Sequence, residues 1–282
     1  MSERDAAPAA VAGQDQRNLL LRIAAAVVLA PLAIGAAYAG GWFWAALAAI
    51  GAIGLFVEWL AVTSAVRRRP AAVAGVVALV LAAPFLAVGN LPGAVVVLAL
   101  GLLAVAFRAA APRRWALAGF IYAAAAELAS VLVRLDRVKG LPALILVLLV
   151  VWATDIGGYF AGRAIGGPKL WPRVSPKKTW SGAIGGFVAS LVVAIAFSAS
   201  DLGQTLPLMI LAAMLSIAAQ FGDLFESAVK RRFGVKDSSH IIPGHGGVMD
   251  RLDGFVAAIV LAAIFGVLRG GVDGVGRALM VW

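Results

Sequence analysis

The sequence predicts an all-α, polytopic membrane protein, and its composition and its long apolar runs both point to this class. Of the 282 residues, 62% are hydrophobic and only 13% are charged, whereas soluble proteins are about half apolar and about a quarter charged. The apolar residues form long runs, unlike the short alternating segments of an outer-membrane β-barrel. Cysteine is absent, which excludes disulfides and thiolate metal sites.

Nine apolar runs approach the roughly 20 residues that a helix needs to cross a bilayer. They cover residues 19–38, 41–62, 71–88, 91–107, 115–133, 141–162, 182–198, 206–228 and 254–268. The first run ends in Ala37-Tyr38-Ala39, which resembles a signal-peptidase site, but it is longer than a usual signal core, so we interpret it as a retained span. We divide the chain into a disordered polar tail (1–18), N-terminal membrane helices (19–140), a catalytic membrane region (141–268) and a C-terminal tail (269–282).

Lysine and arginine alternate between rich and poor connecting segments. They are abundant before the first run and after the second, fourth, sixth and eighth, but absent from the turns at 40, 90–92 and 200–201. Because these residues gather on the cytoplasmic side, we predict a cytoplasmic N-terminus in the inner (cell) membrane, with loops 163–181 and 229–253 on the cytoplasmic face. Segment 134–139, with three cations, is an exception that this topology places outside. The net charge of +10 then indicates orientation and contact with anionic lipid, not nucleic acid.

The end of the eighth run carries polar residues at helical spacing. The residues Glu226, Ser227 and Lys230 lie three, four and seven positions after Asp223, and this spacing places all four on one helix face. Asp223 follows an apolar run, where an ionised carboxylate is costly unless it is paired. We interpret it as a metal or substrate ligand, and the alternative is a structural ion pair with Lys230 or Arg231.

Two further acids stand where the last run begins. Asp250 and Asp253 are three positions apart, so they share one face of the expected helix. The alternative interpretation is the ordinary placement of acids at a helix N-terminus, worth less than about 1 kcal/mol each. With Asp223 they bring three carboxylates to the cytoplasmic ends of consecutive spans, and such ligands suit Mg²⁺ together with substrate phosphate. The sequence therefore predicts an Mg²⁺ site at these three residues and leaves a second metal ion open.

Between these acids lies a polar segment with glycines and cations. His245 stands in Pro243-Gly244-His245-Gly246-Gly247, and glycines permit positive φ and close backbone approach, so we predict an anion-binding loop. His240 is interpreted as structural, and Arg232 as an anchor to lipid headgroups. The cations predicted to neutralise phosphates are Lys230, Arg231, Lys236 and Arg251.

The other cytoplasmic loop offers hydroxyl and ammonium donors to a polyphosphate. Ser175, Lys177, Lys178 and Thr179 fall within five residues, although the segment lacks the spacing of a Walker loop. An ordinary basic loop is the alternative interpretation. Asp155, inside the sixth run, is either a functional ligand or a hydrogen-bonded structural group.

At these residues the chain resembles the phosphatidate cytidylyltransferases, also called CDP-diacylglycerol synthases. The signature reads Ser227-x-Val229-Lys230-Arg231-x4-Lys236-Asp237-x-Ser239-x2-Ile242-Pro243-x-His245-Gly246-Gly247-Val248-x-Asp250-Arg251-Leu252-Asp253. Residues 155–163 and 175–179 also resemble the family, and the resemblance covers about residues 150–265 well. Ser181 is a departure, because many members carry an acid at that position.

The resemblance implies transfer of CMP from CTP to phosphatidic acid, which yields CDP-diacylglycerol and pyrophosphate. Catalytic roles then fall to Ser227, Lys230, Arg231, His245 and Asp250, and metal binding to Asp223, Asp250 and Asp253. Substrate contacts fall to Asp155, Ser175, Lys177, Lys178, Thr179, Lys236 and Arg251. Membrane lipids are expected partners, and a homodimer is left open. Two alternatives remain: an ion-coupled transporter that uses Asp155 and Asp223, and another lipid or polyprenol enzyme that uses a nucleoside triphosphate, such as a kinase.

Overall fold

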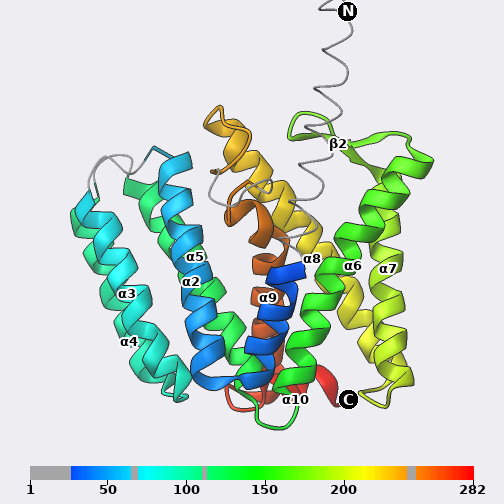
Figure 1. Cartoon of the computed structure of the whole chain (residues 1–282), viewed down its shortest axis with the longest axis horizontal. Helices are drawn as coiled ribbons and strands as arrows, with labels where there is room; N and C mark the ends of the chain where they lie inside the picture. Colours follow the sequence, from blue (N-terminus) through cyan, green and yellow to red (C-terminus); the bar gives the residue numbers. More distant parts are fainter. Residues whose placement is uncertain (1–26, 65–68, 110–112, 240–245) are drawn as a thin grey trace, which may run out of the picture.

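Long apolar helices lie side by side along most of the chain in the computed structural model, which describes residues 27–64, 69–109, 113–239 and 246–282 (Figure 1). Eight helices within these ranges are long and apolar enough to cross a membrane, which confirms the predicted fold class. They are α2 (Gly41–Val62), α3 (Arg69–Ala87), α4 (Leu91–Arg108), α5 (Arg113–Leu135), α6 (Gly140–Ile165), α7 (Trp180–Ala199), α8 (Thr205–Arg232) and α9 (Met249–Gly270).

The first predicted run, 19–38, lies partly outside the described residues. A shorter apolar helix, Val27–Ala39, covers its second half. The ninth span, the polar tail 1–18 and the cytoplasmic N-terminus therefore stay predictions.

Small residues allow α6 and α7 to approach closely. A Cβ atom added at Gly157 would lie 2.6 Å from the Cβ of Ala189, and one added at Gly185 would collide with Ala161. Helices in a bilayer associate through such close packing, because the surrounding lipid is as apolar as the side chains. The α6–α7 pair therefore forms a firm support for the segment that connects the two helices.

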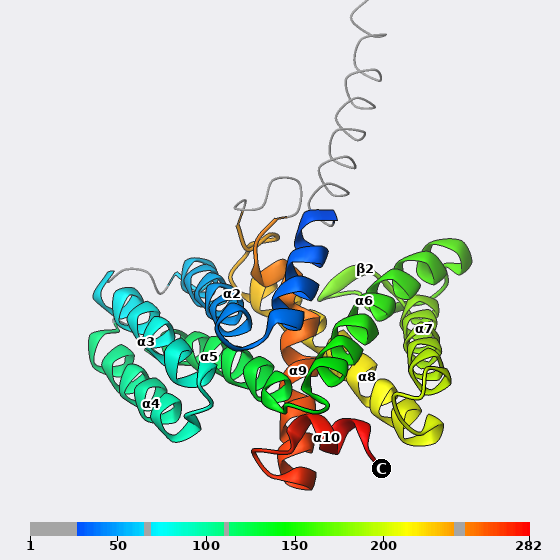
Figure 2. The same ribbon diagram turned by 60° about the horizontal axis from the view of Figure 1, so that its bottom comes forward.

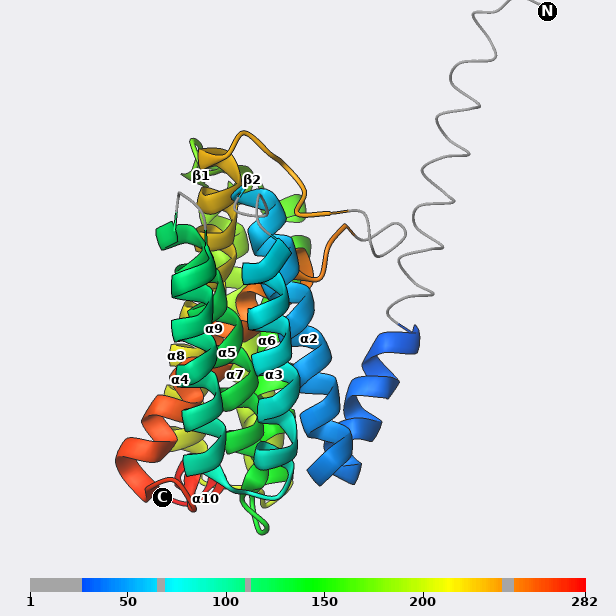
Figure 3. The same cartoon turned by 90° about the vertical axis from the view of Figure 1, so that its left-hand side faces the viewer.

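That connecting segment folds into a short antiparallel hairpin that the sequence analysis did not predict. Strands β1 (Lys169–Trp171) and β2 (Ser175–Thr179) pair Lys169 with Thr179 and Trp171 with Ser175. Thr179 also caps α7, since its Oγ1 accepts a hydrogen bond of 3.1 Å from the backbone N–H of Gly182. The hairpin thus lies at the end of the bundle where α8 ends and α9 begins (Figures 1 and 3).

The opposite end of the bundle is closed by α10 (Val275–Met280), which packs against α9, α6 and α5 (Figure 2). Asp136, in the α5–α6 turn, accepts hydrogen bonds from the backbone N–H and the Nε of Arg277 at 2.9 and 3.0 Å. Burial raises the pKa of Asp136, but the hydrogen bonds from Lys139, Arg277 and Val138 outweigh burial and hold this pKa below its ordinary value. Arg134 donates to the carbonyl oxygen of Ala37. Arg134 is thus the one cation of segment 134–139, the exception in the predicted topology, for which a side-chain contact within the described protein is shown.

Candidate active site

A buried cation joins the end of α8 to the start of α9. Lys230 Nζ lies 2.7 Å from Glu226 Oε2 and 2.5 Å from Asp250 Oδ1. The side chains are only 11%, 2% and 12% exposed, respectively. Because charges removed from water must compensate one another, these three residues hold the two helices in one relative position. We call them the Lys230 triad.

Asp250 also accepts hydrogen bonds from residues on both sides of segment 240–245. Its Oδ2 accepts hydrogen bonds from the backbone N–H of Ser238 at 3.1 Å, from Ser238 Oγ at 2.9 Å and from the N–H of Gly247 at 2.9 Å. Gly246 has φ of +80°, and a Cβ atom there would lie 2.8 Å from Asp250 Oδ2. Positive φ and the close approach to Asp250 therefore favour glycine at this turn, and anion binding by the loop stays a prediction. His245 lies outside the described residues, and its role stays a prediction.

Three other acids form a second, more accessible group below the hairpin. Asp223 forms an ion pair with Lys178 of β2 and accepts a hydrogen bond from Ser227 Oγ at 3.4 Å. Asp155 of α6 interacts electrostatically with Asp223 and Lys178, and Asp253 of α9 interacts with both Asp223 and Asp155. Asp155 is exposed, whereas Asp223 and Asp253 are half-buried. Asp223 stands nine residues before the end of α8, or about 13 Å along the helix axis. We call Asp155, Asp223 and Asp253 the open acid group.

These residues can be tested for their fit to Mg²⁺. Within the ranges that the structure describes, no three His, Cys, Asp or Glu side chains lie close enough together to hold a metal ion. Mg²⁺, however, often takes one or two carboxylates and completes its shell with water and substrate phosphate. Asp223 and Asp253 suit this role, because they are half-buried rather than sealed from water, come from adjacent helices and repel each other, so that a cation between them would be stabilised. Asp250 is less available, since both of its oxygen atoms are already engaged.

The remaining predicted residues lie around this end of the bundle. Lys177, Lys236 and Arg251 are exposed, and Ser175 and Ser227 are half-buried. Thr179 is buried, and its hydroxyl caps α7. Arg231 links α8 to the hairpin turn, because its Nε donates to the carbonyl oxygen of Val174 at 3.4 Å.

Ser181, at the position where many family members carry an acid, also lies in this region. Its hydroxyl donates to the carbonyl oxygen of Gly166 and lies 3.0 Å from Thr179 Oγ1. The serine therefore helps to join the hairpin to the end of α6.

Two residues of this region, Glu58 of α2 and Ser238, are not among the predicted site residues. Glu58 is 1% exposed, and its Oε2 lies 2.8 Å from Ser238 Oγ, which also lies within hydrogen-bond distance of Asp250. A signal was present, since Glu58 is the one acid in the apolar run 41–62. The argument that singled out Asp155, an acid within a predicted span, applies to Glu58 as well.

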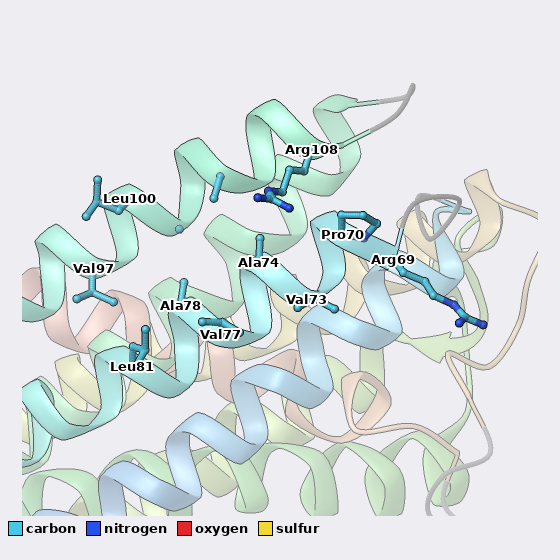
Figure 4. Close-up of a pocket in the computed structure, with 12 residues that line it drawn as sticks. Arg69, Pro70, Val73, Ala74, Val77, Ala78, Leu81, Val97, Leu100 and Arg108 are labelled. Atoms are coloured by element: carbon cyan, nitrogen blue, oxygen red, sulfur yellow. The ribbon is translucent and has the colours of Figure 1, made fainter.

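A groove of about 690 Å³ lies between α3 and α4, away from these residues. Its walls are mainly apolar, with Val73, Val77 and Leu100 among the lining residues, and Arg69 and Arg108 stand at one end (Figure 4). Arginines at helix ends are typical of the membrane border. None of the predicted site residues lines this groove, so it offers neither the carboxylates nor the lysines of the candidate site.

Known proteins resemble this chain over most of its length. The model of the cytidylyltransferase family matches residues 20–268. A phosphatidate cytidylyltransferase from Brucella suis is 38% identical over 263 residues, which cover 89% of this chain and 94% of that protein. Phosphatidate cytidylyltransferases from Staphylococcus haemolyticus and Bacillus subtilis are each 48% identical over 131 and 113 residues, covering 45% and 38% of this chain and 50% and 41% of those proteins. The chain belongs to the cytidylyltransferase family.

Proposed function

We propose that this protein transfers the CMP group of CTP to phosphatidic acid at the membrane interface, giving CDP-diacylglycerol and pyrophosphate. The observation that carries the proposal is the convergence of acids and cations from α6, β2, α8 and α9 at one end of a membrane-spanning bundle. The family and the names of the relatives supply the substrates. These relatives lend no support to the transporter alternative.

In the proposed reaction, an oxygen of the lipid phosphate attacks the α-phosphorus of CTP. A new P–O bond forms, the bond from the α-phosphorus to the β-phosphate oxygen breaks, and pyrophosphate leaves. The nucleophile is already ionised, so the protein needs no general base, and its contribution is positioning and charge neutralisation. This fits a site that is rich in fixed cations.

We assign the side chains different roles according to their positions in the site. Lys178 and the exposed Lys177 of the hairpin are placed to bind phosphate oxygens of CTP. Lys230 places positive charge between the two helices. Asp223 and Asp253 are the primary proposed ligands of Mg²⁺, with Asp250 as the third, and the bound ion would supply positive charge for phosphate oxygens.

The test is transfer of label from CTP to lipid by purified protein in vesicles that contain phosphatidic acid. We expect label on the α-phosphate to enter the lipid, and label on the γ-phosphate to leave as pyrophosphate. Entry of the γ-label into lipid would instead support a lipid kinase. Solute flux without any lipid labelling would support a transporter.

The metal proposal has its own test. Asp223→Asn and Asp253→Asn should each lower the rate and raise the Mg²⁺ concentration needed for half-maximal activity. Arg232→Gln is the matched control, because Arg232 packs over the ring of Trp115 outside the acid groups. Unchanged Mg²⁺ dependence in both acid variants would remove these two residues as ligands. The inner-membrane location and the homodimer stay predictions, for which fractionation and the mass of the solubilised protein are the measurements.

A further inference from the structure

A buried carboxylate from the N-terminal half of the chain holds the segments on either side of residues 240–245. Glu58 Oε1 accepts hydrogen bonds from Ser239 Oγ at 2.6 Å and from the backbone N–H of Val248 at 2.9 Å. Its Oε2 accepts from Ser238 Oγ at 2.8 Å and from the N–H of Met249 at 2.7 Å. Each oxygen therefore receives one hydroxyl and one backbone N–H. The partners are 180 to 191 residues away along the chain.

Two glycines create the space for this contact. A Cβ atom on Gly247 would collide with Ser238 Oγ and with the Glu58 carboxylate. A Cβ atom on Gly54, one helical turn before Glu58, would lie 3.0 Å from Val248 Cγ1. The start of α9 thus lies directly against α2, and Glu58 is enclosed between them.

Glu58 and the Lys230 triad are connected through one serine. Ser238 Oγ lies 2.8 Å from Glu58 Oε2 and 2.9 Å from Asp250 Oδ2. A hydroxyl has a single proton, so it donates to one of the two carboxylates at a time. The backbone N–H of Ser238 donates to Asp250 as well. The position of Asp250, and with it that of Lys230, is therefore coupled to Glu58.

We propose that Glu58 is a positioning residue for the cytidylyl transfer. It fixes Ser238 and Ser239 on one side and Val248 and Met249 on the other, and so sets the place of Asp250 and its lysine partner relative to the reacting phosphates. The proposal rests on the proposed function. Glu58 does so without touching substrate, since its carboxylate is enclosed by protein.

Glutamine is the informative replacement, because it keeps the shape of the side chain while it removes the carboxylate charge and changes the hydrogen-bonding pattern. Glu58→Asp keeps the charge and so serves as the charge control. A carboxylate accepts at both oxygens, whereas an amide has one acceptor and one NH₂ donor. The serine hydroxyls can rotate, but the N–H groups of Val248 and Met249 cannot. In either orientation of the amide, its NH₂ group meets a backbone N–H, and the start of α9 must shift.

The kinetic experiment compares Glu58→Gln and Glu58→Asp with the matched control Glu127→Gln. Glu127, on α5, is also buried, but neither of its carboxylate oxygens has a hydrogen-bond partner among the described residues. We expect Glu58→Gln to lower kcat on the order of 100-fold, the effect of misplacing reacting groups by about 1 Å, with the KM for CTP nearly unchanged. Glu58→Asp should recover part of the rate, and Glu127→Gln should match the wild type.

A second measurement reports position without reference to activity. The chain has no cysteine, so Met249→Cys introduces a single thiol, at a position that is 0% exposed. We expect a maleimide to alkylate this thiol several-fold faster in the Glu58→Gln background than in the Met249→Cys protein alone, at a temperature well below the unfolding transition of both proteins. The backbone N–H that Glu58 binds is retained in both.

The kinetic and alkylation measurements distinguish failure of the positioning proposal from failure of the proposed function. Wild-type kcat in Glu58→Gln, or a loss of kcat that merely follows the fraction of unfolded protein, would overturn the positioning role. Equal alkylation rates would show that Glu58 does not hold the start of α9. If the protein had no cytidylyl activity, the alkylation result would still stand, so that failure of the proposed function is recognised by the labelling assay alone.

Discussion

Replacing Lys230 with methionine tests whether the Lys230 triad acts in catalysis or only in folding. Lys230→Met keeps most of the aliphatic chain but leaves Glu226 and Asp250 without the cation now 2.7 and 2.5 Å away. Asp250 retains its donors from Ser238 and Gly247, whereas Glu226 is 1% exposed, and neither of its oxygen atoms has a hydrogen-bond partner in the described part of the chain that could replace the ion pair with Lys230. Breaking a buried ion pair from one side costs about 3–5 kcal/mol. We expect a loss of this size in the free energy of unfolding of the solubilised protein.

A double variant separates the two roles of the lysine. In Glu226→Gln/Lys230→Met the unpaired carboxylate of Glu226 is gone, so most of the lost stability should return. The rate of α-labelled CMP transfer should stay low, because the positive charge beside Asp250 is still missing. Recovery of the rate together with stability would show that Lys230 is purely structural. A loss below about 1 kcal/mol in the single variant would refute the argument from burial.

Three other predictions concern Asp136, Gly247 and the metal requirement. Asp136→Asn should lower the free energy of unfolding by about 1–3 kcal/mol at pH 7, because the amide NH₂ opposes backbone donors. Burial raises the pKa of Asp136, but its hydrogen bonds lower this pKa by more, so it lies below its ordinary value. Its stabilisation is therefore full above about pH 3.9 and is lost as the pH falls through the folded-state pKa. Unfolding curves of wild type and variant should converge in acid, and a constant difference would contradict this. Gly247→Ala should abolish most CMP transfer, since its Cβ would collide with Ser238 and Glu58, whereas Gly35→Ala, whose Cβ meets no described atom within 4 Å, should not. Chelation of Mg²⁺ should stop transfer, and restored Mg²⁺ should recover it; full activity in excess chelator would contradict a metal requirement.

The helices could be predicted from the sequence because a bilayer demands long apolar segments. The predicted run 41–62 has the same bounds as α2, and 91–107 differs from α4 by one residue. The hairpin at β1 and β2 could not be recognised in this way. Its strands have only three and five residues, contain Pro176 and show no clear alternation. They are held in place by contacts with α7 and α8, which no local pattern reveals.

The helical spacing on α8 predicted one face, but the structure divides that face by depth and by partner. Glu226 and Lys230 are buried in the triad, whereas Asp223 and Ser227 are half-buried below the hairpin. Periodicity identifies which residues share a face, yet it does not say which neighbouring helix covers each part of it. Glu58 could have been singled out as the one acid in its apolar run, but its partners could not be predicted, because they come from the far end of the chain.

The exposure of the ion pairs also explains why the site needs both groups of charges. The Lys230 triad is nearly sealed from water, so separating its members is costly, and it is suited to hold α8 and α9 in place. The Lys178–Asp223 pair has side chains that are 25% and 32% exposed, so separating it costs less than separating the triad. A phosphate can therefore take Lys178 away from Asp223 more readily than it could open the triad, which leaves that carboxylate free to bind a divalent ion. A rigid pair beside an exchangeable one is the arrangement expected where the catalytic charges must stay fixed while the nucleotide enters and pyrophosphate leaves.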